Sequence, residues 1–493
     1  MKRFIYIIAL SFAASACSLK ENPDSFVNED NFYNNDKEAL VAVNGCYRSI
    51  KPIYCASFLH ATEAVTDLAY SFSSGEDAKL DISPAKPEVG TKVWKYAYQG
   101  VKDCNSAIAN IEKMGKPNAN LLGEAKVMRA MYYHLLTSFF GDVPFYTQPV
   151  NTVDDLTKVS HLPRMSAVQT RDSLVNDLLR ILPEMDQIRT SEVDGNRARA
   201  SVGWMLVAKM AMWNERWDTA ISAIDNLEEI YGTFNEDRYP LEDIMWRKKN
   251  TPESIFEIQH KYEKGGIEYV GDCACQMGPY SHTAGTKIFD GVEIPEMGEN
   301  ATAYQPLRPF NNFFNGIFHR DDTDRRQALT IVWEYNGHEF KMGGGNPWLG
   351  PRYWCPNMTG RNDDNNYPVF RYADALLMKA ECYFRISDAT NCAKYLNMTR
   401  LRAGIALMPS STPLADLFYQ IRDERARELF GEFQRKFDLV RWGTWYEDML
   451  EFCTYSTVLR NIKPCHRFYP IPDVEVGLSG GALDNEEYAK YNL

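Results

Sequence analysis

The apolar residues between positions 121 and 140 recur at intervals of three and four, and this spacing constrains the fold more than any other feature. They are Leu121, Leu122, Ala125, Met128, Met131, Tyr132, Leu135, Leu136, Phe139 and Phe140. In an α-helix this spacing places side chains on one face, so it predicts an amphipathic helix. Gly141 is expected to end the helix, and Pro144 prevents it from resuming.

The same periodicity occurs in two pairs of segments. Residues 202–213 and 217–227 each carry an apolar face, and the polar residues 214–216 between them predict a short turn. Residues 370–383 and 393–402 repeat the arrangement around a turn at 386–388. Two amphipathic helices joined by a short turn form an αα-hairpin. Small residues are expected where the paired helices approach closely, at Ala208, Ala220, Ala380 and Ala393.

Residues 260–366 have a different character. Glycines and prolines interrupt every helical pattern there, as at Gly343-Gly344-Gly345 and Pro351. Residues 254–259 and 331–335 alternate polar and apolar side chains, which predicts short strands. Long irregular segments carried by a rigid scaffold are where binding function usually lies.

These patterns predict a mostly α fold of irregular tetratricopeptide-like helical hairpins that form a scaffold, with a loop-rich insertion containing a few short strands. The hairpins are far apart in the chain and show no regular 34-residue period. With 493 residues the chain exceeds one ordinary compact core. We expect a signal peptide at 1–16, an N-terminal helical half at 17–235, the insertion at 236–366 and a C-terminal helical segment at 367–493, all within one structural unit.

The amino terminus predicts export. Lys2 and Arg3 precede an apolar run that is too short to span a membrane, and the segment Ala14-Ser15-Ala16-Cys17 follows. Small residues before a cysteine resemble the lipobox of bacterial lipoproteins. That resemblance implies that Cys17 becomes the first mature residue and carries acyl chains, which anchor a protein stably when two or more are present. The alternative is an ordinary signal peptide, with Cys17 buried or disulfide-bonded.

Composition excludes some classes of partner. The formal net charge is -12, and removal of Lys2 and Arg3 with the signal peptide takes it to -14. A nucleic-acid backbone is therefore not expected as the main partner, because binding phosphates needs clustered Lys and Arg. The chain has 8 His, which argues against a zinc enzyme. It has 28 Tyr, 25 Phe and 10 Trp, more rings than a core requires, so some are available for a binding surface.

No catalytic motif is present, and we predict that the chain is not an enzyme. It contains no GxSxG, HExxH, GxxxxGK[ST] or post-strand GxGxxG. No cofactor is expected. Residues 321–324 and 362–365 are oxygen-rich enough for structural calcium, but they do not match an EF-hand loop, and solvated loop charge is the favoured interpretation.

Many charged residues lie within or beside apolar helical patterns. Catalysis is one interpretation of them, but buried ion pairs that lock helices together are favoured, because buried charges need partners. These residues are Glu124, Arg129, Glu381, Arg400, Arg402, Glu424, Arg425, Glu428, Arg435, Asp438 and Arg441.

Several blocks, in order along nearly the whole mature chain, resemble the SusD/RagB family of outer-membrane lipoproteins from Bacteroidota. The most specific is residues 124–133 followed by Phe140-Gly141-Asp142-Val143-Pro144. Other blocks lie at 17–23, 370–374, 380–381, 396–404, 424–442 and 470–472. Asp374 departs from the family, which more often has Glu there.

The resemblance implies a cell-surface lipoprotein of the outer membrane. Such a protein would capture an oligo- or polysaccharide and deliver it to a SusC-type TonB-dependent outer-membrane transporter. An alternative is the same architecture capturing peptides or glycopeptides, as the RagB side of the family suggests. A third interpretation is that the protein is an enzyme, a surface glycoside hydrolase.

Aromatic side chains are the expected ligand contacts, because sugar rings stack their C–H faces on them. The candidates are Tyr70, Phe72, Tyr280, Trp333, Tyr335, Trp348, Tyr353 and Trp354, with Asn346, Arg352, Asn357, Arg361 and Asn362 as polar partners. The cluster from Trp348 to Trp354 is favoured, since Gly and Pro flank it in a loop context. For each ring alone, local packing is the competing interpretation.

Overall fold

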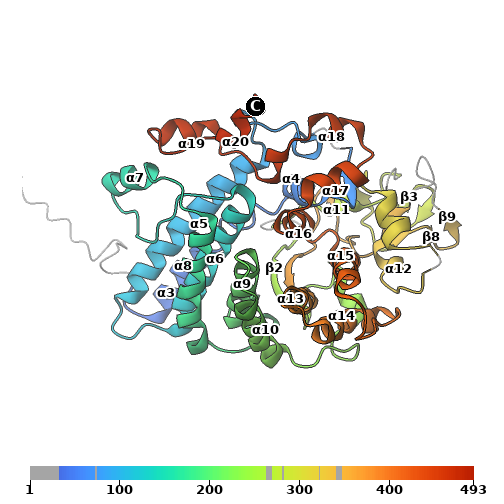
Figure 1. Cartoon of the computed structure of the whole chain (residues 1–493), viewed down its shortest axis with the longest axis horizontal. Coiled ribbons are helices and arrows are strands. Elements are labelled where there is room, and N and C mark those ends of the chain that lie inside the picture. The colour runs from blue at the N-terminus through green and yellow to red at the C-terminus, as the bar shows by residue number, and fades with distance from the viewer. Residues whose placement is uncertain (1–32, 73–74, 263–268, 280–282, 321, 340–346) are drawn as a thin grey trace, which may run out of the picture.

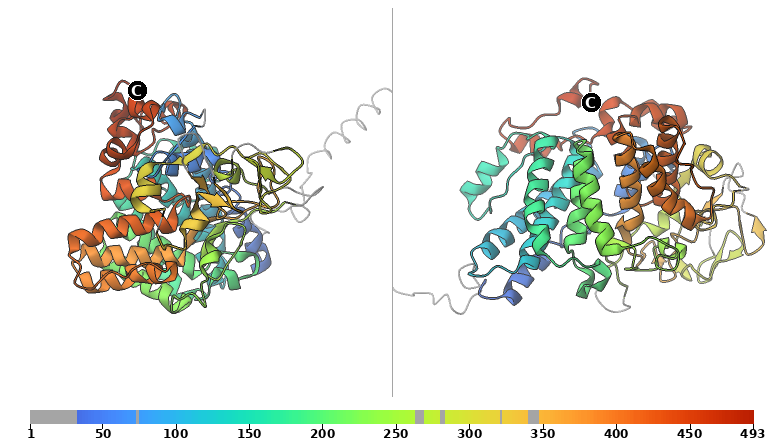
Figure 2. Two further views of the ribbon diagram at one scale, coloured as in Figure 1. Left: turned by 90° about the vertical axis from the view of Figure 1, so that its right-hand side faces the viewer. Right: turned by 60° about the horizontal axis from the view of Figure 1, so that its bottom comes forward.

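Helices dominate the computed structural model of the chain, which describes residues 33–72, 75–262, 269–279, 283–320, 322–339 and 347–493. Figures 1 and 2 show the hairpin of α5 (Val89–Glu112) and α6 (Ala119–Phe140) toward one end, with the strand-rich segment at the other end. The C-terminal helices α13 (Tyr372–Arg385), α14 (Ala389–Ala403) and α15 (Leu414–Leu429) lie beside that segment. The predicted mostly α fold with a few short strands is confirmed.

Helix α6 is the helix that the periodicity predicts. Its N-cap Asn118 accepts hydrogen bonds from the backbone amides of Asn120 and Leu121, at 3.0 and 3.3 Å. Gly141 ends it with a φ of 74°, a conformation that favours glycine. The pairing with α5 is close, because a Cβ atom added at Gly100 of α5 would lie 2.2 Å from the ring of Tyr132.

The two predicted hairpins are also present. Helices α9 (Ala200–Trp213) and α10 (Trp217–Tyr231) form one, and α13 (Tyr372–Arg385) and α14 (Ala389–Ala403) form the other. The four alanines expected at close approaches are all buried. Helix α8 (Ala167–Ile181) packs against α6 and α9, while α10 packs against α13 and joins the two hairpins into one array.

The remaining helices are shorter, apart from α15 (Leu414–Leu429), which packs on α13 and α14. They are α3 (Asp36–Gly45), α4 (Ala56–Leu59), α7 (Val153–Ser160), α11 (Ala274–Met277), α12 (Gln327–Thr330), α16 (Arg435–Trp442), α17 (Trp445–Phe452), α18 (Ser456–Asn461), α19 (Asp473–Leu478) and α20 (Glu486–Ala489).

The strands pair in twos. Antiparallel pairs form between β1 (Ala69–Ser71) and β6 (Leu307–Pro309), β2 (Ser254–Ile258) and β12 (Tyr367–Arg371), β3 (Ile288–Phe289) and β4 (Val292–Glu293), β7 (Ile331–Val332) and β10 (Trp348–Leu349), and β8 (Glu334–Tyr335) and β9 (His338–Glu339). A parallel pair joins β5 (Asn300–Ala301) to β11 (Thr359–Gly360).

The β2–β12 pair brings together the two flanks of the predicted insertion. Strand β2 was expected, and the expected strand at 331–335 exists as two pieces, β7 and β8, separated by Trp333. Phe370 was predicted to belong to a helix, but it lies in β12 opposite Phe256. This difference arises because pairing with a distant strand extends the backbone just before α13 begins.

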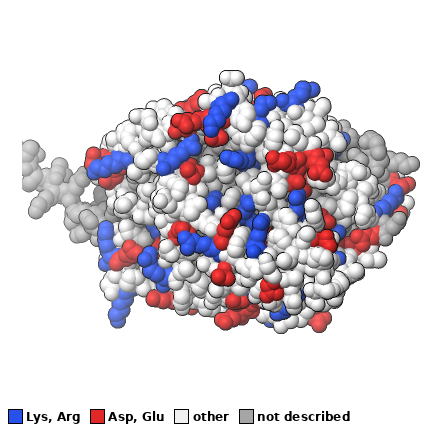
Figure 3. All heavy atoms as spheres, viewed as in Figure 1, with Lys and Arg blue, Asp and Glu red and all other residues white. Residues whose placement is uncertain are grey.

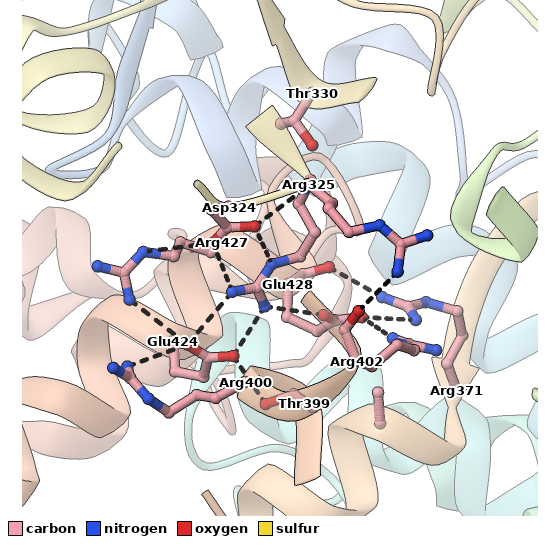
Figure 4. Close-up of polar contacts among 12 residues, drawn as sticks. Asp324, Arg325, Thr330, Arg371, Thr399, Arg400, Arg402, Glu424, Arg427 and Glu428 are labelled. Atoms are coloured by element: carbon pink, nitrogen blue, oxygen red, sulfur yellow. Dashed lines mark hydrogen bonds and ion pairs between the residues drawn. The ribbon is translucent and has the colours of Figure 1, made fainter. Parts of the chain in front are cut away.

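A buried network of charges holds part of this region against the C-terminal helices (Figure 4). The guanidinium of Arg326 lies 2.7 Å from a carboxylate oxygen of Glu424 and 3.0 Å from one of Glu428, both on α15. It also pairs with Asp324 at 2.7 Å, and these four side chains are fully buried. Helix α15 and residues 324–326 are therefore joined by ion pairs from which water is excluded.

Glu428 connects that group to the central β-pair. It lies 3.1 Å from Arg371 of β12 and 2.5 Å from Arg402 of α14, and Glu253 lies within 2.7 Å of the same two arginines. Burial alone would raise the pKa of Glu428, but the guanidinium groups around it, those of Arg402 and Arg371 foremost, hold it far below its usual value. The carboxylate is therefore charged in the folded protein.

The predicted role of the eleven helical charges is confirmed, since each forms an ion pair. Examples are Glu124 with Arg199 at 2.9 Å, Arg129 with Asp177 at 2.7 Å and Arg435 with Asp67 at 2.6 Å. The others pair as Glu381–Arg441, Arg400–Glu424, Arg402–Glu428, Arg425–Asp374 and Arg425–Asp438.

The interpretation of residues 321–324 and 362–365 as solvated loop charge is wrong for three carboxylates. Asp324, Asp363 and Asp364 are buried. Asp324 pairs with Arg326, and Asp363 accepts hydrogen bonds from the amide of Ala274 and the hydroxyl of Tyr367. Protein groups therefore supply the partners that water was expected to provide, some from neighbouring residues and some, such as Ala274, from a distant segment.

Candidate functional site

The aromatic cluster favoured by the sequence is buried. Trp348, Tyr353 and Trp354 have no exposed surface, and neither has Arg352. The prediction that these four side chains present themselves to a ligand is therefore wrong. Arg352 instead pairs with Glu432 and donates a hydrogen bond of 2.7 Å to the carbonyl of Glu428.

Packing within residues 274–358 explains this burial. Trp348 belongs to β10, opposite Val332 of β7, and Trp354 donates a 3.1 Å hydrogen bond from its indole nitrogen to the carbonyl of Leu349. Both tryptophans contribute to a hydrophobic cluster separate from the main core. A segment with so little regular structure stabilises itself by burying large rings.

Two other candidates in this region are half-buried. Trp333 contacts Phe314 edge-on at 6.4 Å, and Tyr335 packs edge-on against Trp354 at 5.1 Å with its hydroxyl bonded to Glu296. Both rings are thus engaged in local packing, the competing interpretation. The candidates Cys17, Tyr280 and Asn346 lie outside the described residues.

Three proposed polar partners are exposed near the same cluster. Asn357 donates a hydrogen bond to Asp364 at 3.2 Å, and the guanidinium of Arg361 lies 5.0 Å from the ring centre of Tyr304. Asn362 bonds through its backbone to Thr359. Because Trp348 and Trp354 are buried, they offer no ring surface beside these three polar groups on which a sugar could stack.

Tyr70 and Phe72 do come together at the surface. Side chains alternate along a strand, so residues two apart share a face. In β1 the flanking Ala69 and Ser71 are buried, while Tyr70 is half-buried and Phe72 is 48% exposed. Their rings meet edge to face, with centres 5.2 Å apart. A hydrogen bond from the amide of Phe72 to the carbonyl of Pro306 continues the strand pairing through this point.

A third ring arrives from the other end of the chain. The centre of Tyr455 lies 5.3 Å from that of Tyr70 and 5.6 Å from that of Phe72. Tyr455 immediately precedes α18, and Asn461 at the end of α18 donates a 3.0 Å hydrogen bond to the carbonyl of Lys79. Packing of α18 on the segment after β1 therefore brings this ring to the other two.

Arg308 adds a cation to the three rings. It stands opposite Tyr70 in the antiparallel register, so both side chains project from the same face. Its guanidinium lies 4.1 Å from the ring centre of Phe72, and its Nε donates to the carbonyl of Gln305 at 3.3 Å. No carboxylate among the described residues lies within ion-pairing distance of it. Tyr70, Phe72, Arg308 and Tyr455 are called the aromatic platform below.

Buried side chains support the aromatic platform. Phe310 stacks on Tyr70 with ring centres 5.0 Å apart, and behind it lies a hydrophobic cluster that includes Val65 and Trp445. Burial raises the pKa of the Tyr70 phenol, against an opposing effect of Arg308, so this hydroxyl is neutral at physiological pH. Gln305, next to the platform, has a φ of 36°, a strained conformation that concentrates at functional sites.

Sequence reasoning missed Arg308 and Tyr455. The alternation of residues 69–72 was a usable signal that Tyr70 and Phe72 share a face. Nothing local marks Tyr455, because its contacts depend on how α17 and α18 pack. Arg308 could be placed only once β6 was known to pair with β1.

The charge pattern on one face of the molecule lacks the clustered basic residues that nucleic-acid binding needs. On the face drawn in Figure 3, basic and acidic side chains are interspersed and do not gather into a basic stripe. Within the part of the chain that the structure describes, no group of three or more His, Cys, Asp or Glu side chains is arranged to hold a metal ion.

Comparison with known proteins now identifies the family. One family model, described as the SusD family, matches residues 353–488. A second, described as starch-binding and associating with the outer membrane, matches residues 22–186. The chain belongs to the SusD/RagB family. A search of the described helices finds none long and apolar enough to cross a membrane.

Relatives of the SusD/RagB family match nearly the whole chain. SusD-like protein P25 of Formosa agariphila is 25% identical, over 99% of this chain and 98% of its own. A SusD homolog from Bacteroides thetaiotaomicron superposes with a TM-score of 0.74 and 19% identity, covering 93% of this chain and 99% of that chain.

A ligand-bound structure is also similar. Surface glycan-binding protein A from Bacteroides thetaiotaomicron, in complex with laminarihexaose, superposes with a TM-score of 0.67 and 19% identity, covering 91% of this chain and 99% of that chain. At these identities the structural likenesses establish the shared fold.

Proposed function

We propose that this protein is a cell-surface lipoprotein of the outer membrane that binds an oligo- or polysaccharide on the aromatic platform and delivers it to a SusC-type TonB-dependent transporter. The single observation that carries the binding proposal is the surface cluster of Tyr70, Phe72 and Tyr455 beside Arg308, whose guanidinium has no carboxylate partner among the described residues.

The chemistry of the platform fits a sugar. Aromatic faces accept the C–H faces of pyranose rings, and the guanidinium of Arg308 can donate hydrogen bonds to sugar hydroxyls. Small-ligand sites combine a few aromatic groups with a few polar ones in this way. The starch-binding description of the matching family model and the laminarihexaose complex of a structural neighbour support a glycan as the ligand class.

Binding should be tested on a panel of polysaccharides that includes starch and laminarin, by affinity electrophoresis of the mature protein. Tyr455→Ala should weaken binding to the polysaccharide that retards the wild type, by at least about 1 kcal/mol. The matched control is Tyr419→Ala, since Tyr419 on α15 is 65% exposed and lies outside the platform. Equal retardation of both variants and the wild type would remove the platform from the site.

The same panel separates the alternatives. If no glycan binds but a peptide library does, the protein captures peptides or glycopeptides. Release of reducing sugar by the pure protein would indicate a glycoside hydrolase. The buried pairing of the helical charges favours a binding role, because those carboxylates are engaged with arginines.

Membrane attachment is a separate part of the proposal. It is supported by the signal-like start of the sequence and by the family model that is described as associating with the outer membrane. Cys17→Ala should release the protein from the outer membrane, and continued membrane association would contradict anchoring through this residue. Co-purification of the wild type with a large β-barrel protein would test delivery to a transporter.

A further inference from the structure

A groove at the end of α3 contains a set of side chains that the platform does not use. One wall is α3 and the turn after it, with Tyr47 and Lys51, and the other is β2 with the separate residue Tyr269. The cavity volume is about 450 Å³. That volume falls within the range of small-ligand sites.

The groove combines an apolar floor with one exposed ring. Ile50, Phe256 and Ile258 line it and are themselves almost entirely buried, so their side chains are fixed in position. The ring of Tyr269 is 54% exposed, although the backbone of this residue is held by two hydrogen bonds to Lys261, at 2.7 and 3.0 Å. A large exposed ring on a fixed backbone is a stacking surface.

Lys51 is the group in the groove whose charge is not compensated. Its ammonium nitrogen lies 5.0 Å from the ring centre of Tyr269, and in the described parts of the chain no carboxylate or hydrogen-bond acceptor lies within bonding distance of it. Partial burial lowers the pKa of this amine. A partly desolvated cation without a partner is stabilised when a ligand brings an anion to it.

The other charges do not fill this need. Arg197 is paired with Glu124 at 2.9 Å, and Arg48 lies 3.6 Å from Asp103 with its side chain 71% exposed. Glu257, the carboxylate that lines the groove, points its oxygens at the amide nitrogens of other residues, accepting bonds of 2.7 to 3.1 Å from Asn250 and Asn366. The local balance therefore favours an anion near Lys51.

We propose that this groove is a second carbohydrate subsite that takes a sugar residue bearing an anionic substituent, a uronate carboxylate or a sulfate ester. The sugar ring stacks on Tyr269 and the anionic group pairs with the Lys51 ammonium. The subsite rests on the proposed function for its ligand class, but none of its residues belongs to the platform. In Figure 1 α3 lies at the lower left, whereas α18, which carries the platform's Tyr455 at its start, lies at the upper right.

Saturation-transfer difference NMR on the mature protein tests this subsite with methyl β-D-glucuronide, glucose 6-sulfate and the neutral methyl β-D-glucoside. The wild type should bind at least one anionic probe about fivefold more tightly than the neutral probe, and 0.5 M NaCl should reduce this preference because salt screens the pairing. Lys51→Gln should abolish the preference and Lys51→Arg should keep it. Tyr269→Ala should weaken binding of every probe in the groove.

Two control variants locate the effect. Lys37→Gln changes an exposed lysine on α3, the helix that precedes Lys51, and Phe72→Ala changes the platform; both should keep the preference for the anionic probe. Equal binding of anionic and neutral probes by the wild type would overturn the subsite, as would a preference that survives in Lys51→Gln or disappears in Phe72→Ala. Failure of the platform proposal is distinguishable, because it would appear as unchanged binding of neutral polysaccharide in Tyr455→Ala, a quantity that Lys51→Gln should not affect.

Discussion

The molecule has two clusters of large aromatic side chains with opposite surroundings. Trp348, Tyr353 and Trp354 lie in a segment rich in glycine and proline and are fully buried. Tyr70 and Phe72 lie in and just after a three-residue strand and meet Tyr455 at the surface. The cluster that is dense in the sequence therefore supports the structure, and the cluster assembled from distant segments is available to a ligand.

The comparison of the two clusters shows that a loop context does not predict whether a ring is exposed. A segment with many irregular turns buries little backbone surface, so it gains stability by burying its own rings. A short strand at the surface needs only one of its faces for the core, and its other face can display rings without destabilising the fold. The expected consequence is a clean separation: changes in the buried cluster affect stability, and changes in the platform affect binding.

The largest effect is expected in the charge network beneath the buried cluster. Glu428→Gln would leave the guanidinium groups of Arg326, Arg371 and Arg402 without one of their carboxylates, and it should lower the free energy of unfolding by about 3–5 kcal/mol. Denaturant titration followed by circular dichroism measures this. A loss below about 1 kcal/mol would show that the network contributes little.

Lowering the pH should also weaken the stabilising effect of this charge network. The pKa of Glu428 is lowered in the folded protein, so its contribution to stability is present above the unfolded pKa of about 4.3 and is lost as pH falls toward the folded value. The wild type should therefore lose stability between about pH 5 and pH 3, and Glu428→Gln should lose less over the same interval. Parallel pH profiles of the two proteins would contradict this assignment.

Within the buried cluster, Trp354→Phe should lower the free energy of unfolding by about 1–3 kcal/mol, because it removes ring volume and the hydrogen bond to Leu349. Glycan affinity of the folded protein should not change. Calorimetric unfolding and titration with the best glycan of the panel give the two quantities. A variant that keeps its stability but loses glycan affinity would show that the buried cluster belongs to the binding site.

On the platform the pattern should reverse. Phe72→Ala should weaken glycan binding by about 1–2 kcal/mol, since it removes the most exposed of the three rings. Its effect on unfolding should be about 1 kcal/mol or less, because the side chain is only half-buried. Isothermal titration and thermal unfolding of the same preparation test both expectations together.

The smallest effect is expected at Arg308. Arg308→Gln keeps a hydrogen-bond donor but removes the charge and the stacking on Phe72, so glycan affinity should fall by about 0.5–1.5 kcal/mol. Arg308→Lys is the conservative comparison and should lose less only if charge matters more than the planar guanidinium. If neither variant changes the glycan affinity, Arg308 does not contribute to binding and only the three rings do.

The helical scaffold could be predicted well because its signals are local. The spacing of residues 121–140 and the glycine after them indicated α6 and its end, and the polar turn at 214–216 indicated the hairpin of α9 and α10. The ion pairs followed from the rule that buried charges need partners. The β-pairing of Phe370 was missed, since it depends on a strand more than a hundred residues earlier.

The site was only half predictable for the same reason. Tyr70 and Phe72 were named from the sequence, and their shared face follows from strand alternation. Tyr455 and Arg308 reach them through packing of α18 and pairing of β6, which no local pattern encodes. The burial of Trp348 and Trp354 likewise follows from contacts made across the insertion and not from their flanking residues.

The most direct test of the platform is the affinity of the double variant Phe72→Ala/Tyr455→Ala for the best glycan of the panel, measured by isothermal titration beside Tyr419→Ala. The double variant should remain folded and lose at least about 2 kcal/mol of binding free energy, a roughly thirtyfold weaker Kd, while Tyr419→Ala binds like the wild type. A double variant that is folded and binds with wild-type affinity would contradict the assignment of glycan binding to these rings.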